Sequence, residues 1–282
     1  MNTVVPLSIL ELVRVATNTM PRDALYNARD IAIHAEQWGY HRIWVAEHHN
    51  MPGIASAATS VVLAHLGAAT SRIRIGAGGI MLPNHVPYVI AEQFGTLAQL
   101  YPERVDLGLG RAPGTDQITL HALRRTPAAS DRFAEDVLEL QAYLAPAQPG
   151  QRIVAAPATG TEVPLWILGS SHYGASLAGE LGLPYSFASH FAPRMLLSAL
   201  EVYRDRFKPS EQQEQPYAMV GVNIIAAETD AEAQYLATSQ QMSMVNLLRG
   251  DTGLLQPPIK DLSSYCSATE QAFFSESSRS RA

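Results

Sequence analysis

Residues 73–114, IRIGAGGIMLPNHVPYVIAEQFGTLAQLYPERVDLGLGRAPG, predict a parallel β–α–β unit. The run 73–79 alternates β-branched and small residues, which indicates a buried strand, and 105–110 repeats this character. Between them the apolar residues recur with helical spacing. The residues on that helix face are Ile90, Phe94, Leu97 and Tyr101. A single crossover helix makes the two strands parallel, so their Gly-rich ends meet at the edge where α/β proteins bind ligands.

The same alternation of strand and helix continues along the chain. Strand patterns lie at 7–10, 42–46, 73–79, 105–110, 164–168, 184–188 and 219–226. Helix patterns lie at 21–38, 55–69, 83–101, 130–144, 173–181, 195–207 and 230–248. We expect Trp38 on the buried stripe of the first helix and Asp230 as the N-cap of the last. This alternation predicts an α/β fold, a TIM (β/α)8-type barrel rather than an open sheet.

The C-terminal part of the sequence departs from a complete barrel pattern. From Asp251 onward no β-branched run follows, so we expect the last strand–helix unit to be lacking. We place one barrel domain at 1–274 and a polar tail at 275–282. Strands with unpaired edges favour association, so we expect a homodimer and reduced activity of the chain alone.

Bulk composition excludes several classes of protein. A net charge of −6 argues against a nucleic-acid partner. The single cysteine, Cys266, excludes an internal disulfide and fits a reducing compartment. The N-terminus has no basic and apolar signal pattern, and the apolar stretch 54–69 is too short and too polar to span a bilayer. These features predict a cytoplasmic protein without a membrane partner.

The sequence Glu47-His48-His49 follows the second strand pattern at its carboxyl end. Neighbouring residues on a strand point to opposite faces, so at most one of the two histidines should face the barrel interior. That argues against a two-histidine metal site, and we predict no metal. A histidine in this place is either a polar loop residue or a catalytic base.

Two further groups of residues are candidates for binding. Gly78-Gly79 ends a strand, and close packing alone would also explain it. Arg111 ends the next strand, and Gly169-Ser170-Ser171 opens a helix whose N–H groups and dipole suit a phosphate. A surface arginine and an N-cap serine are the alternative explanation. Neither Gly-x-Gly pair completes the dinucleotide fingerprint, which disfavours a Rossmann fold.

Several stretches in order resemble the bacterial luciferase-like flavin-dependent monooxygenases, in particular the small luciferase-like oxidoreductases. These stretches are WVAEHHN at 44–50, IGAGGIMLPNHVP at 75–87, PERVDLGLGRAPG at 102–114, WILGSS at 166–171 and ELGLP at 180–184. The resemblance covers roughly residues 6–274. It implies a barrel that holds FMN at the carboxyl face of its strands.

The resemblance also implies roles for individual residues. Gly78-Gly79 matches a strand end that often contains a non-proline cis peptide beside the flavin, and Glu47 matches an acidic residue near it. Arg111 and Ser171 match residues that bind the FMN phosphate. The remaining residues of the same anion-binding turn are Ser170, His172, Tyr173 and Gly174. His48 matches the catalytic histidine of flavin oxygen chemistry, and we expect His49 to be structural or to face solvent.

The reaction implied by the family uses reduced FMN and O2 to oxidise a small organic substrate through a flavin hydroperoxide. A separate flavin reductase would then be a partner. Two alternatives remain open at this point. One is hydride transfer with the deazaflavin F420, and the other is flavin binding without turnover in an incomplete barrel.

Overall fold

The computed structural model describes residues 5–112, 114–267 and 269–270, arranged as two compact units. The first unit holds residues 5–13, 25–50 and 56–222, and the second holds 14–24, 51–55 and the described residues from 223 onward. The single domain at 1–274 stays a prediction. The polar tail at 275–282 lies outside the described residues.

The first unit is built on a seven-stranded parallel sheet whose strands follow one another in chain order. Its strands are β1 (Ser8–Glu11), β2 (Arg42–Val45), β3 (Arg74–Met81), β4 (Val105–Gly110), β5 (Leu165–Gly169), β6 (Tyr185–Phe187) and β7 (Ala218–Val220). Within the described residues, β1 and β7 each pair with one other strand. The predicted (β/α) barrel class is confirmed, with seven of its strands present in this part of the chain.

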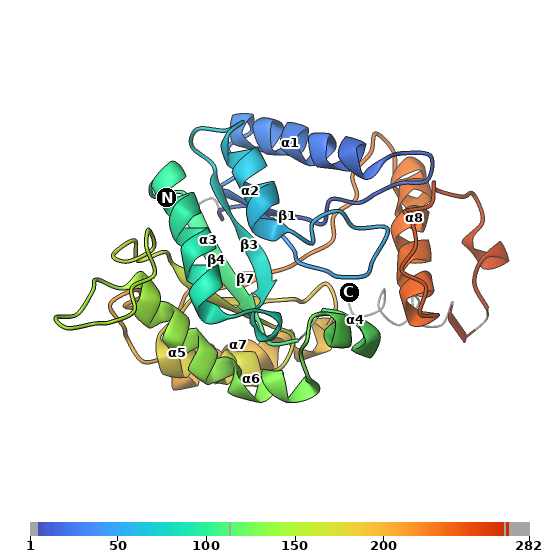
Figure 1. The fold of residues 1–282 in the computed structure, drawn as a ribbon. Coiled ribbons are helices and arrows are strands. Elements are labelled where there is room, and N and C mark those ends of the chain that lie inside the picture. The colour runs from blue at the N-terminus through green and yellow to red at the C-terminus, as the bar shows by residue number, and fades with distance from the viewer. Residues whose placement is uncertain (1–4, 113, 268, 271–282) are drawn as a thin grey trace. The chain divides into compact units, whose positions relative to one another are not determined.

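Helices connect the strands and cover the outside of the sheet. They are α1 (Pro21–Gln37), α2 (Thr59–Gly67), α3 (Pro87–Leu100), α4 (Gln117–Ala122), α5 (Phe133–Leu144), α6 (His172–Leu181) and α7 (Leu196–Arg206). Helix α3 packs against α5, and α6 packs against α7 (Figure 1). No helix in the described residues combines the length and the apolar character needed to cross a bilayer.

Both faces of the central strands are buried, which is why they read as apolar runs in the sequence. All residues of β2 and β4 are buried. Trp44 of β2 meets Trp166 of β5 edge to face, with ring centroids 5.2 Å apart. The Trp44 indole N–H donates to Asp106 of β4 (3.2 Å), and Arg74 of β3 pairs with the same carboxylate. This buried acid therefore ties three neighbouring strands together near their amino ends.

Three details of the sequence-based assignment are wrong. Trp38, expected on the buried stripe of the first helix, lies just past the end of α1 and is 71% exposed. Strand β7 ends at Val220, and the β-branched residues that follow it are exposed, so apolar composition there does not mark a strand. Helix α8 (Asp230–Leu248) is capped by Thr229, which accepts from the Glu232 N–H (3.2 Å), and not by Asp230.

The second unit is formed by segments distant in sequence. The Thr17 N–H donates to the Leu255 carbonyl (3.0 Å), and the Leu255 N–H donates to the Val15 carbonyl (2.8 Å). Arg14 donates to the Ser243 hydroxyl of α8 (3.1 Å). These bonds join the segment before α1 to the C-terminal part of the chain.

The Glu36 carboxylate fixes the turn that leads into β3. It accepts backbone N–H groups of Ser71 (2.9 Å) and Ile73 (2.8 Å), and also that of Arg72. Burial raises the pKa of Glu36, but the N–H groups of Ile73, Arg72 and Ser71 outweigh this and lower it to about 2. A depressed folded-state pKa means that the contribution is complete above pH 4.5 and is lost as pH falls toward about 2.

Glu36→Gln should lower the free energy of unfolding at pH 7 by roughly 1–3 kcal/mol, because charge-assisted hydrogen bonds are lost. The difference from the parent should shrink as pH falls from 4.5 toward about 2, where the parent carboxylate also protonates. Urea denaturation across this range measures both effects. The exposed Glu201→Gln in α7 is the matched control, and equal stability of Glu36→Gln and parent at pH 7 would contradict the assignment.

Candidate active site

A buried carboxylate lies where β2 and β3 end. Glu47 follows β2 by two residues, and its side chain is 1% exposed. Its backbone N–H donates to the Gly79 carbonyl (3.2 Å), and its Oε2 accepts the Met81 N–H (3.1 Å). Both partners belong to β3, so these two bonds fix the segment after β2 against the end of the neighbouring strand.

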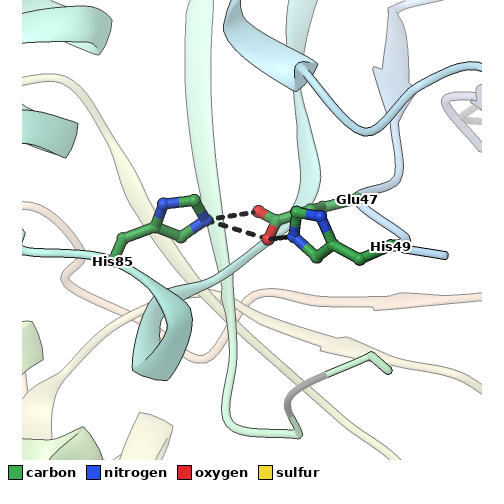
Figure 2. A group of neighbouring side chains, drawn as sticks. All are labelled: Glu47, His49 and His85. Atoms are coloured by element: carbon green, nitrogen blue, oxygen red, sulfur yellow. Dashed lines mark hydrogen bonds and ion pairs between the residues drawn. The ribbon is translucent and has the colours of Figure 1, made fainter. Parts of the chain in front are cut away.

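Two imidazoles bind this carboxylate. Nε2 of His49 lies 2.6 Å from Glu47 Oε1, and Nε2 of His85 lies 2.8 Å from Oε1 and 3.0 Å from Oε2. Figure 2 shows the carboxylate between the two rings, each with Nε2 turned toward it and Nδ1 on its far side. The His49 and His85 side chains are 17% and 28% exposed, so the carboxylate is buried while its partners reach the surface.

The surroundings of Glu47 keep it ionised. Burial raises the pKa of its carboxyl, but the hydrogen bonds from His49, His85 and the Met81 N–H, together with the charge of His85, lower it to about 2. An ionised carboxylate can only accept hydrogen bonds, so each Nε2 must donate. A neutral imidazole that carries its proton on Nε2 leaves Nδ1 as an acceptor, which makes both rings potential bases or ligands.

The arrangement of the two neighbouring histidines differs from the expectation in one respect. His49 shares the side of Glu47 and contacts its carboxylate, so the solvent-facing alternative for His49 is wrong. His48 lies between them in the chain and is half-buried. Its catalytic role stays a prediction.

The Gly-Gly pair lies at a close approach of two strands. The Gly78–Gly79 peptide bond is cis, as the resemblance implied. A Cβ on Gly79 would lie 2.6 Å from the Gly108 carbonyl oxygen of β4, and a Cβ on Gly108 would collide with the Ala77 carbonyl. The register between β3 and β4 shifts at this point. Side chains are therefore excluded here, and β3 and β4 pack backbone against backbone next to Glu47.

The predicted phosphate-binding residues come together at a second place on the same face. The Arg111 guanidinium lies 4.0 Å from the centre of the Tyr173 ring, so the residue after β4 stacks on the first turn of α6. Ser170 precedes this helix, and Ser171 is its N-cap. His172 Nε2 lies 2.8 Å from the Ser198 hydroxyl of α7. Contacts with Arg111 and with Ser198 thus hold the first turn of α6 from two sides.

The amino end of α6 is open to a ligand. Arg111, Ser171, His172 and Tyr173 are exposed, and in the described structure the Ser171 side chain does not cap the helix. The first N–H groups of a helix have no partner within it, and the helix dipole favours an anion there. Gly174 packs against Gly169 of β5, where a Cβ would meet the Gly169 Cα at 3.4 Å. This end of the helix therefore stands close to its strand.

Strands β3 and β4 connect the Glu47 carboxylate and its histidines to Arg111 and the first turn of α6. Met81, whose N–H holds Glu47, pairs in register with Gly110, and Arg111 comes next. His85 and Met81 were not among the predicted site residues. His85 follows a short 3-10 turn (η1, Leu82–Asn84), and nothing in its sequence spacing from Glu47 indicates the contact. The polar His-Val-Pro turn after a Gly-rich strand was the available signal.

Known proteins of one family match this chain over most of its length. A family model described as luciferase-like monooxygenase matches residues 6–265. A luciferase-like monooxygenase of Escherichia coli is 52% identical over 268 residues, which cover 95% of this chain and 80% of that protein. An N-acetyl-S-alkylcysteine monooxygenase of Bacillus subtilis is 34% identical and aligns over 86% of this chain and 74% of its own length.

Solved structures agree on the fold. The crystal structure of apo-MsnO8 superposes with a TM-score of 0.85 at 34% identity, over 96% of this chain and 79% of that one. At 17% and 20% identity, two further structures share the fold with TM-scores of 0.69 and 0.62. They are the oxygenating constituent of 3,6-diketocamphane monooxygenase from Pseudomonas putida in complex with FMN, and an F420-dependent secondary alcohol dehydrogenase. The first covers 88% of this chain and 75% of its own chain, and the second covers 92% and 79%.

The geometry of the carboxylate predicts the tautomers of its partners. In the ligand-free protein at pH 8, His49 and His85 should both carry their proton on Nε2, because ionised Glu47 can only accept. Long-range ¹H–¹⁵N NMR distinguishes the tautomers, with exposed His121 as the reference ring. Glu47→Gln should change both signals and lower the unfolding free energy by roughly 1–3 kcal/mol. An Nδ1–H tautomer at either ring in the parent would contradict the hydrogen-bond scheme.

Proposed function

Because this chain belongs to the luciferase-like monooxygenase family, we propose that it is an FMN-dependent monooxygenase. It would use reduced FMN and O2 to oxidise a small organic substrate, with electrons delivered by a separate flavin reductase. The single observation that supports this most is the stacking of Arg111 on Tyr173 at the open end of α6. That arrangement is suited to one end of a phosphorylated cofactor and leaves the rest of the carboxyl face for its ring system.

The phosphate would be bound by Arg111 and the first turn of α6. The guanidinium supplies a fixed fork of N–H donors, and Tyr173 keeps its plane in place. The backbone N–H groups after Ser171 and the Ser170 and Ser171 hydroxyls add neutral donors. These residues fit a phosphate dianion in charge and in donor number, and Gly174 lets the helix lie near the strand end.

The ring system would lie against the ends of β3 and β4. Gly78, Gly79 and Gly108 carry no side chains, so β3 and β4 pack closely there and no side chain from these positions would project toward a flat ligand. Glu47 would orient this surface, because its carboxylate is fixed by Met81 and by two imidazoles. Bound FMN in its reduced form supplies the electrons for O2 activation. His48 would hold or transfer a proton next to the reacting atoms.

One relative supports a class of substrates to test first. The Bacillus subtilis protein named N-acetyl-S-alkylcysteine monooxygenase is 34% identical to this chain, and this supports small organosulfur compounds as the first substrates to test. F420-dependent hydride transfer and flavin binding without turnover are the outcomes that would replace the proposal.

Arg111→Ala should weaken FMN binding by roughly 10- to 150-fold, which corresponds to the 1.5–3 kcal/mol of a charge-assisted hydrogen bond. Titration followed by flavin fluorescence measures the affinity. Arg132→Ala, which removes an arginine with 66% side-chain exposure, is the matched control and should bind FMN as the parent does. Equal affinity in Arg111→Ala and parent would reject the phosphate assignment. Binding of F420 without binding of FMN would favour hydride transfer.

His48→Ala should slow oxidation of an N-acetyl-S-alkylcysteine by reduced FMN and O2 about 10²- to 10⁴-fold, the usual contribution of a general acid or base. Its FMN affinity should stay within a few fold of the parent. Single-turnover product formation and FMN titration measure the two quantities separately. If His49→Ala alone abolished turnover while His48→Ala had no effect, the roles of the two histidines would be reversed.

A further inference from the structure

We propose that Glu47, His49 and His85 form a binding site for a divalent transition-metal cation of the zinc type in the flavin-free protein. The three residues each offer one ligand atom, and these atoms lie within 4.8 Å of one another. Two imidazole nitrogens and one carboxylate oxygen are a donor set that zinc accepts in proteins. The inference concerns the cation alone and does not depend on the flavin assignment.

The geometry of the three donors suits one shared cation. Both Nε2 atoms already point at the same oxygen, Oε1 of Glu47, at 2.6 and 2.8 Å (Figure 2). Zinc at about 2.0–2.1 Å from each ligand needs donors about 3.3 Å apart in a tetrahedral arrangement. Each hydrogen bond therefore has to widen by well under an ångström, which small rotations of the two half-buried rings allow.

The charge balance also favours a cation. Glu47 is a fully buried carboxylate that stays ionised, and its ion-pair partners in the described structure are the two imidazoles, which carry charge only when protonated. With both rings neutral the site has a charge of −1, and a divalent cation changes it to +1. Binding replaces the two imidazole N–H donors of the carboxylate with one cation, and the Met81 N–H remains as a donor.

Proton positions change in a defined way on binding. Each ring gives up the proton on Nε2 and takes one on Nδ1 from solvent, so both imidazoles stay neutral and no net proton is released. Nδ1 of each ring lies on the side away from the carboxylate, where it can carry that proton (Figure 2). The exposed fractions of 17% and 28% give the cation a path to the buried oxygen.

Supporting contacts hold the ligands from behind. The Met81 N–H binds Oε2 of Glu47, and the Asn84 side-chain amide lies 3.5 Å from Oε1, the oxygen that would bind the cation. The His85 N–H closes the η1 turn onto Leu82 (2.9 Å), and the side chain of Leu82 is buried. Contacts of this kind orient metal ligands and strengthen binding. Three protein donors leave a fourth position for water, as in zinc sites that are not closed.

The test is calorimetric titration of ZnCl2 into the flavin-free full chain at pH 7.5. The parent should bind one zinc ion with a dissociation constant below about 100 µM, and His49→Gln and His85→Gln should each weaken binding about tenfold or more. Glutamine keeps an N–H donor for Glu47, so these variants preserve the fold better than alanine does. The control His121→Gln changes an exposed histidine of α4 and should bind zinc as the parent does.

A second readout reports the ligands directly. Zinc should move the proton of His49 and His85 from Nε2 to Nδ1 in ¹H–¹⁵N spectra of the parent and leave the His121 ring unchanged. Absence of zinc binding up to about 1 mM, or equal affinity in the parent and both glutamine variants, would overturn the proposal. FMN titration of the same preparation tests the proposed function separately, because zinc binding is measured without flavin.

Discussion

The buried carboxylate of Glu47 is the interaction on which the rest of the site depends. It joins the segment after β2 to the end of β3 through one backbone bond to Gly79 and one side-chain bond from Met81. A carboxylate without partners in this place would be costly. The cost falls because four groups donate to its two oxygens: the imidazoles of His49 and His85, the Met81 N–H and the side-chain amide of Asn84. The positions of His49, His85 and Met81 are therefore coupled to its charge. Loss of that charge would loosen both strand ends together.

The second constraint is steric and lies between β3 and β4. Gly79 and Gly108 approach so closely that neither position accommodates a Cβ without displacing backbone. The register between the strands shifts there. Beyond the shift Met81 pairs with Gly110, and Arg111, the next residue, stacks on Tyr173. One face of the sheet thus carries an ionised, hydrogen-bonded acid at one place and an open, electropositive helix end at another. The paired ends of β3 and β4 connect these two places.

Much of the fold could be predicted from the sequence, because it rests on local periodicity. Buried parallel strands give continuous apolar runs, and β2 to β5 were recognised from such runs within a few residues. Apolar composition gives wrong predictions where a residue is apolar but exposed. Trp38 continues the helical spacing but follows the last turn of α1, and the residues after Val220 have strand composition without a sheet partner in the described structure. The spacing of apolar residues in the sequence does not predict the exposure of Trp38 or the end of β7 at Val220.

The site, like the fold, could be predicted from the sequence only in part. Arg111 and the turn around Ser171 follow from two strand ends and a helix start, and the structure brings them together. His85 could not be paired with Glu47 from the sequence, because the contact depends on how the η1 turn bends back over β3. Alternating side-chain directions at 47–49 would require these residues to continue the strand, yet β2 ends at Val45. Tertiary contacts such as the one between His49 and Glu47 set the side-chain directions instead.

The proposed function requires the carboxyl face of this sheet to bind FMN with its phosphate at the amino end of α6. The most direct measurement is a crystal structure of the chain grown with FMN. The account predicts phosphate oxygens in contact with the Arg111 guanidinium and the first N–H groups of α6, with the flavin ring beside Gly79 and Glu47. Electron density for FMN at another place, or an empty α6 terminus in crystals that contain bound FMN, would contradict it.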